Sequence, residues 1–110
     1  MNFFALDNLL AQHSDAGRPY FEFLRRESMS VGIYELPAGG VDGQSPHTED
    51  EIYYVLAGRA EATVGEQQQS IEPGSVIFVE ANAEHRFHDI TEDLRLLVIF
   101  APPESSDNEG

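Results

Sequence analysis

Apolar and polar residues alternate in short runs over most of the chain, and turn-forming residues separate the runs. Such alternation is typical of β-strands that bury one face, and closely spaced short strands are typical of a sandwich or a barrel. The pattern therefore predicts an all-β protein, with strands at 20–26, 29–36, 51–56, 59–64, 68–71, 75–80, 84–90 and 94–101.

The first 16 residues follow a different pattern, with apolar residues at helical spacing: Phe3, Leu6, Leu9 and Leu10. They predict a short amphipathic helix that ends near Gly17 and packs on the outside of the domain. Acidic residues interrupt this segment and no basic residue precedes it, so we do not expect a signal peptide. Since no apolar run approaches the ~18 residues of a membrane-spanning helix, we expect a cytoplasmic protein.

The end of the sequence has a third character, because residues 104–110 contain no apolar side chain. Such a segment cannot bury enough apolar surface to offset the entropy lost on ordering. A sequence of 110 residues is also too short for more than one ordinary core. We therefore predict a single domain over 1–103 and a disordered acidic tail over 104–110.

The composition limits the partners and the catalytic groups that the protein can use. Six residues are basic and 20 are acidic, for a net charge of −14 at pH 7. The sequence has no cysteine and no lysine, which excludes disulfides, thiolate nucleophiles, zinc fingers and Schiff-base catalysis. Any catalysis must use His, Asp, Glu, Tyr, Ser or a metal ion. The negative charge repels phosphate backbones and anionic lipids, so we expect a small-molecule partner and neither nucleic acid nor membrane.

Candidate metal ligands are concentrated in two segments, 39–58 and 74–89. Side chains two apart on a strand share a face, so a His near a strand end, such as His47, and a Glu on its hairpin partner can converge inside a barrel. The second segment supplies a third group, because an apolar strand and a tight turn at 81–83 lead into His85.

The spacing in these segments resembles the two motifs of the cupin family. The first motif fits at Gly39, Ser45, His47, Glu51 and Gly58, and the second fits at Gly74, Glu80, Asn82, His85 and Asp89. Two motifs in the right order make a specific signal. The strand rhythm around them extends the resemblance over residues 19–101.

The resemblance implies a small jelly-roll barrel of about eight to ten antiparallel strands, and it favours a homodimer. It also implies one divalent metal ion per chain, held by His47, Glu51 and His85. Ser45 stands where the family usually has its first metal-ligating His, so we expect it near a vacant position as a hydrogen-bond donor or water anchor. Two imidazoles and one carboxylate suit non-haem Fe(II), and they also accept Mn, Ni, Co or Zn.

Three other carboxylates lie close to these residues in the sequence. We expect Glu49 and Asp50 to be solvated in a turn, with Glu49 as a reserve ligand because it is two residues from His47. Asp89 shares the inward parity of His85, so we expect it either to support a ligand or to cap the strand.

Two histidines are left outside the predicted site. His88 is three residues beyond His85 and should face the opposite way on a strand, at the surface. His13 ends the predicted helix, where a cation favours the helix dipole, and we expect no further role. Asn82, in the turn before His85, replaces a glycine of the motif and tolerates the left-handed conformation.

The barrel lining predicted from the strand pattern comprises Tyr53, Val55, Phe78 and Phe87. With an open metal position, the leading hypothesis is a metal-dependent, oxygenase-like enzyme acting on a small organic molecule. The alternative is a non-catalytic small-molecule binding or sensor module. A structural or storage domain would leave the His and Glu spacing unexplained.

Overall fold

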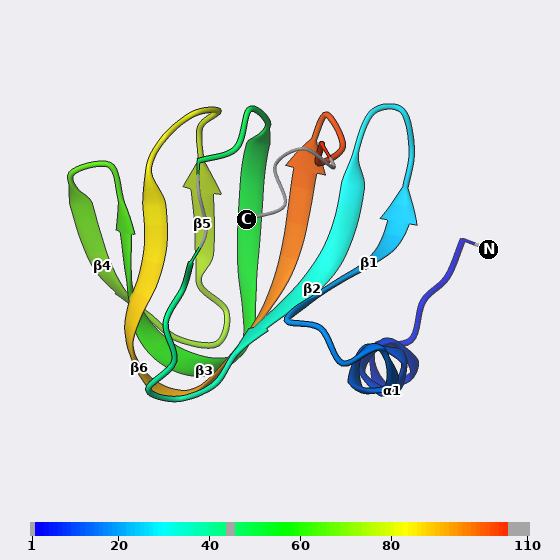
Figure 1. Ribbon diagram of the computed structural model, residues 1–110, viewed down its shortest axis with the longest axis horizontal. Coiled ribbons are helices and arrows are strands. Elements are labelled where there is room, and N and C mark those ends of the chain that lie inside the picture. Colours follow the sequence, from blue (N-terminus) through cyan, green and yellow to red (C-terminus); the bar gives the residue numbers. More distant parts are fainter. Residues whose placement is uncertain (1, 44–45, 106–110) are drawn as a thin grey trace.

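A computed structural model describes residues 2–43 and 46–105, which form one helix and six strands (Figure 1). The helix precedes all the strands. The elements are α1 (Leu6–Ala16), β1 (Tyr20–Arg25), β2 (Ser30–Leu36), β3 (Asp50–Val64), β4 (Gln67–Ile71), β5 (Val76–Val79) and β6 (His85–Ala101).

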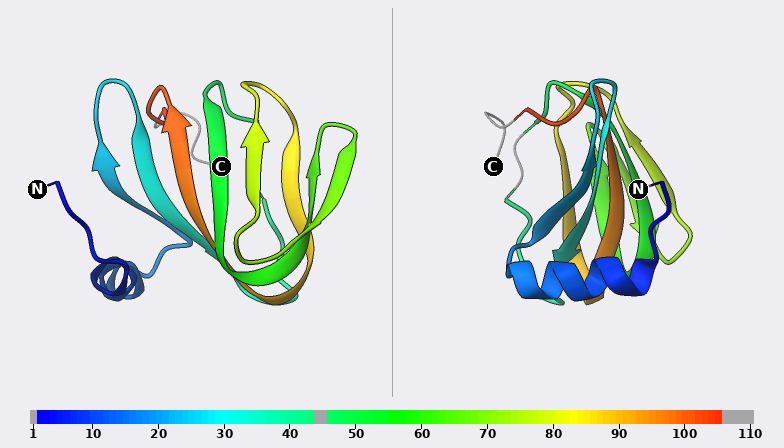
Figure 2. Two further views of the ribbon diagram at one scale, coloured as in Figure 1. Left: turned by 180° about the vertical axis from the view of Figure 1, so that it is seen from behind. Right: turned by 90° about the vertical axis from the view of Figure 1, so that its right-hand side faces the viewer.

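All six strands belong to one antiparallel sheet in the order β1-β2-β6-β3-β4, with β5 paired to β3. The long strands β3 and β6 pair along both of their halves and bend together, so the sheet rolls over on itself (Figures 1 and 2). The predicted all-β fold with a short N-terminal helix is confirmed.

The number of strands differs from the prediction of eight to ten. The predicted pairs 51–56 with 59–64 and 84–90 with 94–101 are continuous as β3 and β6. Gly58 bends β3 without ending it, because its φ is +95° and a Cβ there would lie 2.2 Å from the Asp93 carbonyl oxygen. A turn signal inside a strand therefore marks a bend where two backbones approach closely.

The core lies on the inner face of the rolled sheet and contains Tyr53, Val55, Phe87, Leu96 and Val98, each at most 3% exposed. Three of the four predicted lining residues are thus buried. Phe78 is 58% exposed, because it lies opposite Ile52 on the outer face while the neighbouring Val79 points inward.

Helix α1 lies outside the sheet, beside β1 (Figure 2). It ends as predicted at Gly17, whose φ of +67° allows its N–H to bond to the His13 carbonyl. His13 has more than the expected dipole role, since it is 2% exposed and its ring stacks on Phe21 at 5.8 Å. Among the described residues, α1 included, no helix is long and apolar enough to cross a membrane.

Candidate metal site

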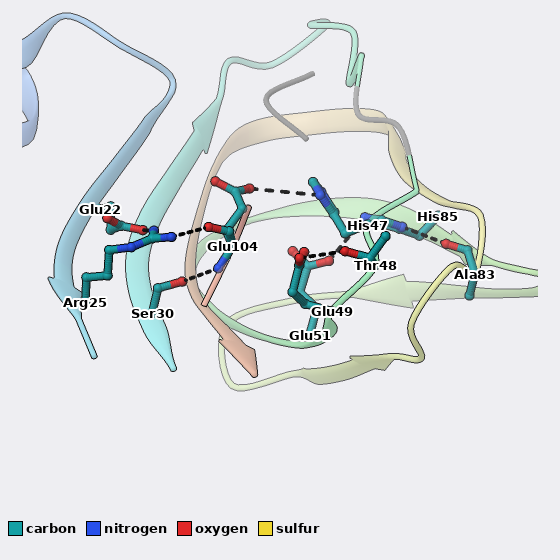
Figure 3. A network of polar contacts seen from close by, with 10 residues as sticks. All are labelled: Glu22, Arg25, Ser30, His47, Thr48, Glu49, Glu51, Ala83, His85 and Glu104. Carbon is teal, nitrogen blue, oxygen red and sulfur yellow. Dashed lines mark hydrogen bonds and ion pairs between the residues drawn. The ribbon is translucent and has the colours of Figure 1, made fainter. Parts of the chain in front are cut away.

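The three predicted metal ligands lie together at one end of the rolled sheet (Figure 3). One nitrogen of His47, one nitrogen of His85 and one carboxylate oxygen of Glu51 all lie within 4.8 Å of one another. The three residues are 5%, 7% and 1% exposed. Their convergence is a feature of the structure, and their role as metal ligands stays a prediction.

Strand parity brings His47 and Glu51 to the same face. In β3 the buried positions alternate, with Glu51 and Tyr53 inside and Ile52 outside. The alternation extends backwards from the strand through Glu49 to His47, both of which are buried.

Two hydrogen bonds join the turn before β6 to the first residue of β3 and to the loop that precedes it. The Asn82 N–H donates to the His47 carbonyl at 2.6 Å, and the Ala81 N–H donates to the Asp50 carboxylate at 2.9 Å. Asn82 has a φ of +68°, so it takes up the left-handed conformation that its position in the motif suggested. These bonds hold His47 and His85 near each other through the backbone.

His85 is oriented by its own turn. Its Nδ1 lies 3.1 Å from the Ala83 carbonyl, which can only accept, so Nδ1 carries the proton. Nε2 then keeps its lone pair and lies 3.4 Å from a Glu51 carboxylate oxygen. A carbonyl that fixes the tautomer in this way is the usual support of a metal-binding imidazole.

The electrostatics of the cluster favour a cation. Burial, together with the Glu104, Asp42 and Glu49 carboxylates, raises the pKa of Glu51 to about 8. Burial and the neighbouring His85 lower the pKa of His47, so its imidazole is neutral at pH 7. A divalent ion between these groups would stabilise the carboxylate form of Glu51 and use neutral imidazoles, which are the states that metals require.

Glu49 was expected to be solvated, and the structure shows that it is buried. It is 4% exposed, and the Thr48 hydroxyl donates to it at 2.7 Å. The parity shared with Glu51 could have predicted this burial. Asp50 is exposed as expected, but the hydrogen bond that its carboxylate accepts from the Ala81 N–H was not predicted.

Asp42 was missed by the sequence reasoning. Its carboxylate accepts from the Tyr34 hydroxyl and from the Phe87 N–H, each at 2.9 Å, and so fastens the loop before the site to β2 and β6. In the sequence it lies between glycines, where an aspartate is typical of an ordinary turn.

The remaining predicted residues fall outside the cluster. Ser45 lies outside the described residues. His88 faces away from His85, as predicted, but contacts Thr63 and Asp89, each at 2.7 Å. Asp89 is exposed and not inward, because its φ of +49° breaks the alternation along β6.

The family model for the cupin domain matches residues 32–100, well over half of the sequence. The chain belongs to the cupin family. An uncharacterized protein of Streptomyces coelicolor, SCO3923, is 50% identical to this cupin over 105 residues, which cover 96% of this chain and 100% of that protein.

Two solved structures show the same fold as this cupin. TT1209 from Thermus thermophilus has a TM-score of 0.73 at 26% identity, over 94% of this chain and 99% of that one. A chain from the crystal structures of the DMSP lyases RdDddP and RnDddQII has a TM-score of 0.69 at 27% identity, over 74% of this chain and 46% of that one.

The C-terminal segment of this cupin also reaches the site. Glu104, which the sequence placed in a disordered tail, is held by hydrogen bonds to Ser30 and Arg25, and its carboxylate lies 4.0 Å from His47 Nδ1 (Figure 3). A tail without apolar residues gave no signal for this contact, since polar anchors hold the segment. Residues 106–110 lie outside the described residues.

Proposed function

We propose that this cupin binds one divalent metal ion through His47, Glu51 and His85 and is a metal-dependent enzyme acting on a small organic molecule. One observation carries the proposal. Three buried side chains from two separate segments place their donor atoms within 4.8 Å of one another, and burial, together with nearby carboxylates, raises the pKa of Glu51 to about 8.

The donor set indicates which ions fit. Two imidazole nitrogens and one carboxylate oxygen suit Fe(II), and they also accept Mn, Ni, Co and Zn. Three protein ligands leave open positions on an ion that prefers six. At those positions a bound ion would supply Lewis-acid or redox chemistry to an oxygen-bearing substrate.

The residues around the cluster have definable tasks in such a site. The Ala83 carbonyl holds the His85 proton on Nδ1, away from Glu51. Glu51 must release a proton to bind a cation at neutral pH, since its pKa is about 8. Behind His85, the space between Tyr53, Val79 and Phe87 leaves no room for a water molecule, so packed side chains close this side of the site.

An oxygenase-like reaction remains the leading enzymatic proposal, because its substrate and O₂ both need open metal positions. A chain with this fold comes from the crystal structures of two DMSP lyases. This similarity supports the proposal of an enzyme that acts on a small organic molecule. The alternative is a non-catalytic binding or sensor module. It is supported by the tight interior and by the cover that Glu104 provides over His47.

The test is whether a metal ion bound at this site has a coordination position open to an added ligand. Loaded with Fe(II) under anaerobic conditions, the protein is expected to bind nitric oxide and give the paramagnetic resonance signal of a high-spin iron–nitrosyl. The His85→Ala variant, treated identically, should give none. One iron per chain without a nitrosyl signal would contradict the oxygenase proposal and leave the binding module.

We also propose that the protein is a homodimer that pairs through the outer face of β3 and β5. Ile52 and Phe78 lie opposite each other there, as do Tyr54 and Val76, and all four are 39–64% exposed. Two chains of charge −14 meet with least repulsion through an uncharged surface of this kind. Phe78→Glu should convert a dimer to a monomer in light scattering, whereas a wild-type monomer would refute the proposal.

A further inference from the structure

The segment after β6 is fastened across the end of the sheet that holds the site. The Glu104 N–H donates to the Ser30 hydroxyl at 2.9 Å, and the Glu104 carbonyl accepts from Arg25 at 2.6 Å. Ser30 is fully buried at the start of β2, and Arg25 ends β1. Two neighbouring strands therefore fix the backbone of Glu104 beside the site.

The side chain of Glu104 points from this anchored backbone toward His47 (Figure 3). It is only 15% exposed, and its carboxylate lies 4.0 Å from His47 Nδ1. Burial is the main cause of the raised pKa of both Glu51 and Tyr20, and Glu104 is the neighbouring charge that adds most to each.

The backbone bonds that anchor residue 104 do not require its side chain to be a carboxylate. The bonds to Ser30 and Arg25 both use the backbone of Glu104, and the Arg25 guanidinium forms its ion pair with Glu22 at 2.9 Å. An uncharged residue at position 104 could form the same two backbone bonds. The carboxylate is therefore a separate feature, directed at a cluster that already contains Glu51 and Glu49.

We propose that the Glu104 carboxylate adds a further negative charge to the site, and that it strengthens binding of the divalent cation while discriminating against anionic co-ligands. The inference rests on the proposed metal site. One negative charge next to the ion attracts the cation and repels an anion that approaches an open position, so it moves the two affinities in opposite directions. The site therefore selects neutral or cationic substrates.

The experiment compares wild type with Glu104→Gln, which keeps the shape of the side chain and removes its charge. Co(II) affinity is measured by competition with a chelator, and azide is then titrated into the Co(II)-loaded protein. In Glu104→Gln we expect Co(II) binding to weaken about tenfold and azide binding to tighten several-fold. Asp15→Asn, at an exposed position of α1 outside the sheet, also removes one negative charge and should change neither affinity.

A second variant tests the anchoring. Ser30→Ala removes one backbone bond and leaves the carboxylate intact, so both affinities should shift in the same directions by a smaller factor. Either affinity of Glu104→Gln matching that of wild type would overturn the inference, while loss of Co(II) in His85→Ala would still uphold the metal site. Absence of Co(II) binding by the wild-type protein would overturn both.

Discussion

Two buried histidines each face a glutamate, one on each side of the sheet. Inside, His85 lies 3.4 Å from Glu51, and outside, His13 of α1 lies 3.3 Å from Glu35. Both imidazole side chains are 2% exposed. The two pairs look alike in distance and burial, yet their surroundings give them different properties.

The outer pair is balanced. His13 uses its other nitrogen for the Arg18 carbonyl, and Glu35 also contacts the Arg95 guanidinium at 2.6 Å. Glu35 is 35% exposed, so water solvates what remains of its charge. This network joins the helix to the sheet, and nothing in it calls for a further ligand.

The inner pair is unbalanced. Glu51 is 1% exposed, and this burial is the main cause of its raised pKa. A hydrogen bond with Tyr53 lowers the pKa, and the charged groups that raise it further are all carboxylates. The imidazoles of His47 and His85 lie beside it with ring centres 5.6 Å apart. A buried His and Glu pair therefore indicates a site when its charge is uncompensated and further donor atoms converge on it.

The largest expected difference between the pairs is in metal content. His85→Ala should reduce bound metal from one ion per chain to nearly none, with the β-sheet circular dichroism largely retained, because the core consists of apolar strands. Plasma mass spectrometry measures the metal. His88→Ala is the matched control on the same strand and should keep its ion, and equal metal in both variants would refute the assignment.

The second prediction concerns pH and the metal-free protein. Glu51 titrates near 4.5 when unfolded and at about 8 when folded, so folding favours its protonated form. The preference of the folded state for protonated Glu51 adds to the free energy of unfolding. This stabilisation is fully present below pH 4.5 and is lost as the pH rises to 8, for a total on the order of 3–5 kcal/mol.

Urea unfolding of chelator-treated wild type and Glu51→Gln between pH 5 and pH 8 measures this contribution. The wild type should lose stability relative to the variant as pH rises. His47, whose lowered pKa opposes folding at low pH, is common to both proteins. Parallel stability curves would show that Glu51 is not held in an uncompensated environment.

The smallest expected effect belongs to the outer pair. His13→Ala removes the stacking on Phe21 and the contact with Glu35, and should destabilise the fold by about 1–3 kcal/mol. Metal content should stay at the wild-type value. Thermal unfolding and metal analysis of the same sample test this, and loss of metal would remove the distinction between the two pairs.

The sequence predicted those parts of the fold and the site that follow from local rules. Strand parity and motif spacing predicted that Glu51 and His85 point inward, and both are buried, because the alternation of side chains depends only on neighbouring residues. Parity failed at Asp89, where a positive φ breaks the alternation, and at Phe78, because β5 is apolar on both faces and its pattern does not show which face is inward.

The contacts that sequence reasoning missed are all between distant segments. Glu104 reaches the site through Ser30 and Arg25, and Asp42 joins β2 to β6 through its two carboxylate oxygens. Each contact depends on where the rolled sheet brings separate strands together. No spacing along the chain encodes that geometry, so such residues become visible only in the folded structure.

The hydrogen bonds from Asn82 to His47 and from Ala81 to Asp50 bear on how the proposed site would be loaded. Because the chain's own groups join the two segments, the proposed ligands would be brought together without a metal ion, unlike those of small domains that fold around zinc. A finished site with mixed nitrogen and oxygen donors follows the general affinity order of divalent metals. The ion bound at the proposed site would then depend on which metals the cell makes available when loading occurs.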